Sequence, residues 1–388
     1  MNKHHNFKNF LTPIILILII TLASINFNQI KPFNSIITSL QFKNSSLNEK
    51  NNNKNNILMD YIPTSTKASK NRDIKLYVGG FPIGIRMNTE GVLVVGFSDI
   101  EIKDTRLESP GRKAGIEIGD TIIKIDGKRV LNSKELQKVV NECKSDNLTV
   151  EIKRDDKTIE RNIKTILSSV DNSKKIGLWV RDSTAGVGTL TFYDKESNIY
   201  GALGHPITDA DTNSVLKVRN GEVLDSSIIG VKKGAKGAPG ELKGIFINEN
   251  DRRGNIDANT YAGIYGKLDS DNKFKFSSQP MQIMERKQVK EGKAKILTTI
   301  DENGPRLYDA EIIKVYNQDS PDTKSMVIKV TDKRLLDKTG GIVQGMSGSP
   351  IIQDDKLVGA VTHVLVNRAD VGYGIYIEWM LEEAHIIN

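Results

Sequence analysis

A serine between glycines lies near the end of the chain, and a histidine between a glycine and a proline lies much earlier. The serine is Ser347, within the sequence GMSGSP, and the histidine is His205, within GALGHP. A serine hydroxyl is a weak nucleophile at neutral pH unless a neighbouring imidazole accepts its proton. Glycines allow the sharp turn that directs backbone N–H groups at an oxyanion. The two segments therefore predict nucleophilic acyl-transfer chemistry.

The nucleophile segment contains a second serine, Ser349, which is the rival candidate. Ser347 is preferred because a glycine follows it and Gly345 lies two residues before it. This spacing lets the N–H groups of Gly345 and Ser347 hold the oxyanion.

His205 competes with four other histidines. His4 and His5 lie on the far side of an N-terminal apolar segment, and His385 lies in a predicted terminal helix. His363 follows the serine on a predicted strand, where it is expected to be an ordinary strand residue close to substrate. A carboxylate that orients the histidine usually completes such a catalytic triad. Spacing alone does not identify this residue; the candidates are Asp209, Asp332 and Asp337.

Composition excludes several other functions. Cys143 is the single cysteine, so an intrachain disulfide is impossible. The net charge of +7 is spread along the chain with no basic tract, which argues against nucleic-acid binding. The sequence has no His-Glu-x-x-His, no cysteine pair and no phosphate-binding loop, so we expect no metal and no cofactor.

The N-terminus has the pattern of an export signal. Lys3 and Lys8 precede an apolar run from residue 10 to 27, which predicts an uncleaved signal anchor over residues 1–28. The positive flank places the remainder of the chain outside the cytoplasm. Residues 29–75 are rich in Asn and Lys and predict a solvated linker.

Residues 76–168 resemble a PDZ domain. The resemblance lies in the order Ala114-Gly115-Ile116, Gly119-Asp120 and Ile125-Asp126-Gly127, followed by a helix from about Ser133. PDZ domains add a peptide to a sheet edge beside a glycine-containing loop. That loop is expected at Gly79–Ile85, and its peptide-binding residues would be Gly80, Phe81, Ile83 and Gly84. Pro82 removes one donor there, which argues against binding of a free carboxylate.

Residues 170–388 consist of regularly spaced short strands with a short C-terminal helix, which predicts a barrel or sandwich. This part resembles chymotrypsin-like peptidases, because segments 357–362 and 374–376 follow the serine in the order of the cleft strands. The resemblance implies a trypsin-like double β-barrel. Met346 excludes the zymogen ion pair of that class, and Gly341 argues against a simple preference for Lys or Arg.

The whole chain resembles the SpoIVB serine peptidase family, through the strings around His205 and Ser347 and a PDZ domain that precedes the peptidase. HtrA-type peptidases carry PDZ domains after the catalytic part and match less well. The resemblance implies a triad of His205, Asp332 and Ser347. It also implies a sporulation role: the peptidase crosses the forespore inner membrane, cleaves itself, and cleaves a regulator of an intramembrane protease. This cleavage leads to late sigma-factor activation. A general envelope quality-control peptidase and a catalytically silent PDZ adaptor are the alternatives.

Overall fold

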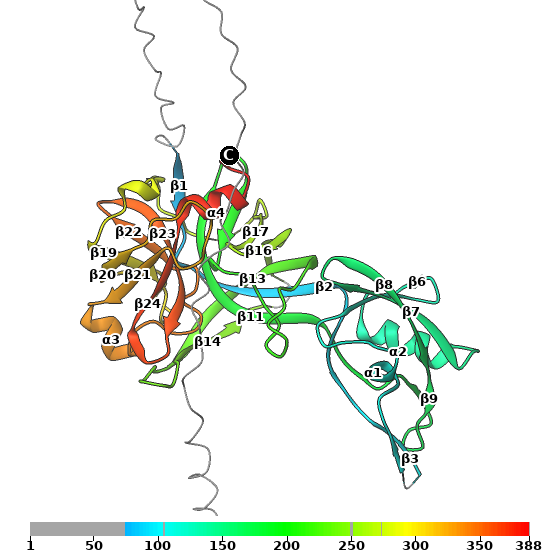
Figure 1. The fold of residues 1–388 in the computed structure, drawn as a ribbon. Helices are drawn as coiled ribbons and strands as arrows, with labels where there is room; N and C mark the ends of the chain where they lie inside the picture. Colours follow the sequence, from blue (N-terminus) through cyan, green and yellow to red (C-terminus); the bar gives the residue numbers. More distant parts are fainter. Residues whose placement is uncertain (1–73, 104, 249–250, 273, 388) are drawn as a thin grey trace, which may run out of the picture. The chain divides into compact units, whose positions relative to one another are not determined.

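The computed structural model describes residues 74–387, apart from residues 104, 249–250 and 273 (Figure 1). The predicted anchor at 1–28 and almost all of the predicted linker lie outside the described residues. Among the described helices, none is both long and apolar enough to span a bilayer. As predicted, the described chain is mainly β.

The last third of the chain forms a closed antiparallel barrel. Its strands follow one another in the order β19 (Gly292–Thr298), β20 (Arg306–Val315), β21 (Met326–Val330), β24 (Arg368–Tyr376), β23 (Lys356–Leu365) and β22 (Pro350–Gln353). Alternate residues of each strand enter the barrel, as Tyr308, Ala310 and Ile312 do from β20. The predicted terminal helix is present as α4 (Ile377–Glu383), and α3 (Lys333–Thr339) leads into the nucleophile segment.

The first half of the predicted peptidase belongs to a larger sheet, and six of its strands close a ring, as the predicted second barrel requires. The strands involved are β1 (Lys75–Val78), β2 (Pro82–Phe97), β11 (Leu178–Asp194), β12 (Ile199–Ala202), β13 (Val218–Lys232), β14 (Glu241–Phe246), β15 (Arg252–Asn255), β16 (Ala258–Thr260), β17 (Gly263–Lys267) and β18 (Met281–Gln282). The ring runs β11–β2–β13–β15–β17–β12 and back to β11, with an antiparallel bridge from Gly254 to Leu268 joining β15 to the end of β17. The core of these strands contains Ile83, Leu190, Tyr200 and Val223.

The PDZ strands belong to the same sheet. They are β5 (Thr121–Ile125), β6 (Lys128–Arg129), β7 (Asn147–Arg154) and β8 (Lys157–Lys164), with hairpins β3 (Ile100–Ile102)–β4 (Thr105–Leu107) and β9 (Ile166–Leu167)–β10 (Lys174–Lys175). Helices α1 (Pro110–Lys113) and α2 (Ser133–Glu142) complete the unit. Asp126 and Gly127 have φ of 47° and 73°, which confirms the predicted hairpin turn. Asn132 caps α2 by accepting from the Glu135 amide at 2.8 Å.

Two long strands, β2 and β11, connect the PDZ strands with the peptidase strands and lie side by side (Figure 1). Residues 83 and 85 of β2 pack in the peptidase core, whereas Val92 and Val94 pack in the PDZ core. Conversely, Ile176 packs in the PDZ core although it lies beyond residue 168. The predicted boundaries, 76–168 and 170–388, therefore differ from the structural division, because each long strand serves both cores.

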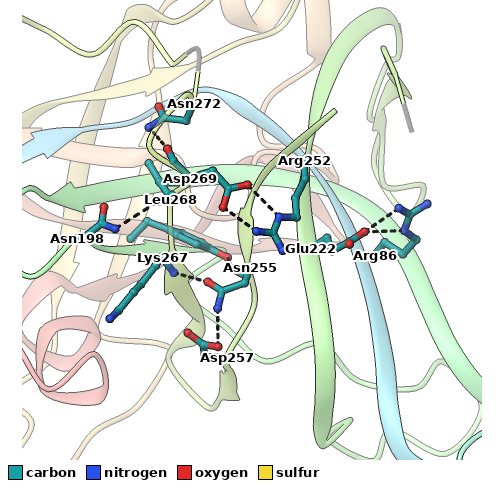
Figure 2. Close-up of polar contacts among 11 residues, drawn as sticks. Arg86, Asn198, Glu222, Arg252, Asn255, Asp257, Lys267, Leu268, Asp269 and Asn272 are labelled. Carbon is teal, nitrogen blue, oxygen red and sulfur yellow. Dashed lines mark hydrogen bonds and ion pairs between the residues drawn. The ribbon is translucent and has the colours of Figure 1, made fainter. Parts of the chain in front are cut away.

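Polar side chains hold the outer strands of the peptidase sheet together (Figure 2). Arg252 donates two hydrogen bonds of 2.9 Å to Asp269, which ties β15 to the end of β17. Asn255 accepts from the Lys267 amide at 2.7 Å, and Arg86 of β2 pairs with Glu222 of β13 at 2.7 Å. These contacts stiffen the sheet that carries the histidine segment.

Candidate active site

The nucleophile segment is a tight turn between α3 and β22. Gly348 has a φ of +94°, and a Cβ on it would lie 2.1 Å from the carbonyl oxygen of Thr189. Its amide donates to the Val361 carbonyl at 2.8 Å, and the Ser349 amide donates to Met346 at 2.9 Å. A larger residue than glycine at 348 would therefore displace the turn.

Two amides of this turn are unused. The amides of residues 344, 346, 348 and 349 all donate to backbone carbonyls, but no hydrogen bond of the described residues uses the amides of Gly345 and Ser347. Gly345 has a φ of +95°, a conformation that glycine adopts without strain. The predicted oxyanion donors are thus the two amides left free to bind a ligand oxygen.

Thr189 of β11 anchors the same turn, a role that sequence reasoning missed. Its hydroxyl donates to the Gly345 carbonyl at 2.8 Å, and its amide donates to the Ser347 carbonyl at 3.0 Å. A threonine on a β-strand carries no local signal of such a role, because the bond joins residues far apart in the chain. The peptidase sheet thereby holds a turn that belongs to the barrel.

His205 follows a short left-handed segment in which Leu203 and Gly204 have φ of 71° and 70°. Its Nδ1 lies 2.8 Å from the Pro206 carbonyl oxygen. A carbonyl only accepts, so Nδ1 carries the proton and Nε2 keeps its lone pair. Burial lowers the pKa of His205, while the bond to Pro206 acts in the opposite direction. The imidazole is therefore in the tautomer that a general base requires.

One pocket of about 600 Å³ brings the candidate residues together. Its lining includes His205 from the sheet and Gly345, Ser347 and His363 from the barrel side. The Ser347 hydroxyl donates to the Thr362 carbonyl at 2.9 Å, and no hydrogen bond of the described residues joins it to His205. A rotation of the serine side chain is needed before its proton can pass to the imidazole.

Among the residues that the structure describes, no carboxylate lines this pocket. Asp332, the third member implied by the family resemblance, caps α3 instead: it accepts from the Arg334 amide at 2.8 Å and pairs with the Arg334 guanidinium at 2.6 Å. That hydrogen bond from Arg334 lowers the pKa of Asp332 to about 2. The structure therefore does not bring Asp332 to His205, because a local cap and ion pair use both of its oxygens.

Neither of the other carboxylate candidates lines the pocket. Asp209 is buried, pairs with Arg181 and accepts from the Thr212 amide at 2.9 Å. Asp337 is exposed on α3. The rival nucleophile, Ser349, is fully buried and donates to the Thr298 hydroxyl at 2.9 Å. Of the candidates, Ser347 and His205 share the pocket, together with the competing histidine, His363.

The rest of the pocket is mostly apolar. The side chains of Ile342, Val343, Val364 and Val366 contribute to it, and the two histidines are the only titratable groups in its described lining. A Cβ on Gly341 would lie 2.0 Å from the Ala369 carbonyl oxygen, so an acidic side chain does not fit there. The pocket suits an apolar side chain next to the bond that reacts.

The predicted PDZ loop is wrong. Gly80, Phe81, Ile83 and Gly84 belong to the peptidase sheet: the Gly80 amide donates to Leu190, and its carbonyl accepts from Thr299. Ile83 is fully buried, and a Cβ on Gly84 would lie 2.6 Å from the Phe246 ring. These residues build the core of the sheet and present no free edge to a peptide.

A groove beside the PDZ helix is formed by a different segment. It measures about 780 Å³ and lies between α2, with Leu136 and Val140, and residues 174–180, with Leu178 and Trp179. The beginning of β11 pairs with β2 through Leu178–Arg181, and the described strand pairings leave its other edge open. The segment Ile176-Gly177-Leu178 repeats the apolar-Gly-apolar pattern of Ile83-Gly84-Ile85. The same sequence pattern therefore also indicates this segment as a candidate peptide-binding strand.

Comparison with known proteins agrees with the site. Residues 172–381 match the family described as SpoIVB peptidase S55, and residues 81–165 match a PDZ domain. No curated protein matches the chain.

Solved structures resemble parts of the chain. The PDZ domain of an SdrC-like protein from Listeria monocytogenes is 25% identical, with 24% of this chain and 87% of that chain covered and a TM-score of 0.19. The active form of the Rv3671c protease from M. tuberculosis is 13% identical over 51% of this chain and 74% of that chain, with a TM-score of 0.28. The HtrA-type protease AlgW with a decapeptide is 11% identical over 56% of this chain and 55% of that chain, with a TM-score of 0.31.

The S55 match covers more than half of the sequence and includes both pocket residues, His205 and Ser347. The chain belongs to the SpoIVB peptidase S55 family, and it is a serine endopeptidase that carries a PDZ domain.

Proposed function

We propose that Ser347 is the nucleophile and His205 the general base of this peptidase, with the Gly345 and Ser347 amides as oxyanion donors. The observation that carries the proposal is the shared pocket, in which a free-Nε2 imidazole and two unused amides surround one serine. The Ser347 oxygen attacks the peptide carbonyl carbon while its proton passes to Nε2 of His205. The same proton then goes to the departing amine. In the second half of the reaction, His205 takes a proton from a water molecule, which attacks the acyl-enzyme, and the proton returns to Ser347 as the acid product leaves.

The Thr362 carbonyl connects substrate binding with this first step. In the free enzyme it accepts the Ser347 hydroxyl at 2.9 Å. An extended substrate that pairs with β23 would offer its own backbone N–H to the same oxygen. Substrate would then release the hydroxyl, which is free to turn towards His205.

Ser347→Ala tests the assignment, with Ser349→Ala as a matched control in the same turn. We expect Ser347→Ala and His205→Ala to abolish both peptide hydrolysis and self-cleavage during expression, while Ser349→Ala keeps both. Continued self-cleavage of purified Ser347→Ala protein would show that this serine is not the nucleophile.

The family suggests the wider role. We propose a peptidase tethered to the forespore inner membrane that acts in the intermembrane space, cleaves itself, and cleaves a membrane regulator of an intramembrane protease. A candidate regulator mixed with purified enzyme should be cut at a few positions, and the Ser347→Ala enzyme should leave it intact. Equally rapid degradation of unfolded casein would favour the alternative, an envelope quality-control peptidase.

The groove between α2 and β11 is the proposed peptide site of the PDZ domain. Its open strand edge and apolar side chains suit an extended segment with an apolar residue, bound by strand addition. Trp179 lines this groove and is 64% exposed, whereas Trp379, the other tryptophan, is 2% exposed. Binding of apolar peptides should therefore change the tryptophan emission of Ser347→Ala protein, and should not change it when Trp179→Phe is added.

A further inference from the structure

His363 is a second imidazole in the active-site pocket that the proposed mechanism does not use. Its ring centroid lies 4.9 Å from that of His205, with 37° between the ring planes. The two rings come from different parts of the fold, since His205 follows β12 of the sheet and His363 is on β23 of the barrel. The contact therefore bridges the two halves that must meet for catalysis.

The backbone of His363 is held firmly. The preceding residue, Thr362, is buried and its hydroxyl donates to the Thr323 carbonyl at 3.0 Å. A Cβ on Gly372 of the neighbouring strand would lie 2.4 Å from the His363 carbonyl oxygen. The register of β23 against β24 shifts between Val361 and Val364, so the bond of Thr362 and the close approach of Gly372 fix the backbone from which the His363 ring contacts His205.

The general base needs such a contact. Its Nδ1 is held by the Pro206 carbonyl, and the described part of the chain places no carboxylate in the pocket. A carboxylate normally both orients the imidazole and stabilises the imidazolium that forms during reaction. With no such carboxylate among the described residues, the ring of His363 is the neighbour that limits where the His205 ring can lie.

His363 is in the neutral form at neutral pH. Although the side chain of His363 remains exposed on one side, its partial burial and the nearby His205, followed by Lys324, lower the pKa of His363 to about 4, and Asp322 acts in the opposite direction. These three groups are the titratable neighbours that face its ring from the histidine segment and from residues 322–324. A neutral ring adds no charge repulsion when His205 accepts the serine proton.

We propose that His363 is a positioning residue for the general base, which packs a neutral ring against His205 and shields it from water. The inference rests on the proposed roles of His205 and Ser347. It predicts that the ring matters more than its nitrogen atoms, because packing and shielding are its contribution.

The test compares His363→Ala with His363→Phe, using Leu307→Ala, which removes an exposed apolar side chain of the barrel outside the pocket, as the control. For His363→Ala we expect kcat on a fluorogenic peptide to fall about tenfold. A positioned general base raises the rate by about 10²–10⁴, and a base that has lost its neighbouring ring should lose only part of that gain. KM should stay within about twofold, since the scissile bond still binds the same donors. His363→Phe should recover most of kcat, and Leu307→Ala should keep all of it.

The pH dependence gives a second readout. Burial lowers the pKa of His205, so removal of the covering ring should raise that pKa towards the ordinary value. The acid limb of kcat/KM should then move to higher pH in His363→Ala and stay in place in His363→Phe. An NMR titration of His205 in the inactive Ser347→Ala background measures the same shift without turnover.

The outcomes separate this inference from the proposed function. If His205→Ala stays active, the proposed base is wrong. If His205→Ala is inactive but His363→Ala keeps its kcat and acid limb, only the role of His363 is refuted. A change in KM alone, or an equal loss of kcat in the Ala and Phe variants, also refutes it. Thermal unfolding of each variant identifies any loss caused by misfolding.

Discussion

Replacement of Thr189 by valine tests how the oxyanion turn is held. Valine keeps the shape of threonine but removes the hydroxyl that donates to the Gly345 carbonyl at 2.8 Å. Thr189 is 2% exposed, so the carbonyl loses this donor in a largely dry site, at a cost of about 1–3 kcal/mol in stability. The Gly345 amide is free to shift, and loss of one oxyanion donor costs up to about 10²–10³ in kcat. We expect a fall in kcat of about 10- to 100-fold.

Thr191→Val is the matched control. The Thr191 hydroxyl also donates to a carbonyl of this turn, that of Gly348, at 2.8 Å, and the residue is fully buried. However, the Gly348 amide is bonded to Val361 and takes no part in oxyanion binding. This variant should lose similar stability but keep kcat within about threefold. Steady-state kinetics and denaturant unfolding measure both effects, and an equal loss of kcat in the two variants would refute the reasoning.

Two further predictions concern titratable groups. Asp332→Asn should keep kcat within about threefold, because Asp332 caps α3 away from the pocket, and should lose about 1 kcal/mol of stability. The pKa of Asp332, about 2 in the fold against about 3.9 unfolded, means that this loss is present above about pH 4 and disappears towards pH 2. A loss of activity of about 10⁴-fold, as for a triad aspartate, would restore Asp332 as the third member. The acid limb of kcat/KM should have its midpoint below the ordinary histidine value of about 6.5, because burial lowers the pKa of His205; a midpoint above 7 would contradict this.

Local patterns in the sequence predicted local structure well. The Asp126-Gly127 turn, the helix from Ser133 and the C-terminal helix all lie where turn chemistry and periodicity placed them. The glycines around Ser347 also predicted the turn with two free amides, because positive φ at positions 345 and 348 is a property of those residues themselves. Each of these features depends on residues that are close together in the chain.

Features that depend on distant residues were predicted less well. Asp332 has the spacing of a family triad residue, but Arg334, two positions away, offers it a cap and an ion pair without any loop closure. The sequence around Thr189 did not indicate its role, because the carbonyl that it binds, that of Gly345, lies far away in the chain, in the turn that leads into the barrel strand β22. Pairing of this kind is decided by the packing of the whole sheet and not by propensity.

The misplaced PDZ loop shows the same limit and has a functional consequence. An apolar-Gly-apolar segment occurs both at 83–85 and at 176–178, and only strand pairing decides which of them lies beside α2. In the structure the second segment does so, as the beginning of β11. Further along this one strand, Thr184–Val187 line the catalytic pocket and Thr189 holds the oxyanion turn. The open edge beside α2 and the support of the active site are therefore parts of a single continuous strand, so a shift at one end has a direct covalent path to the other.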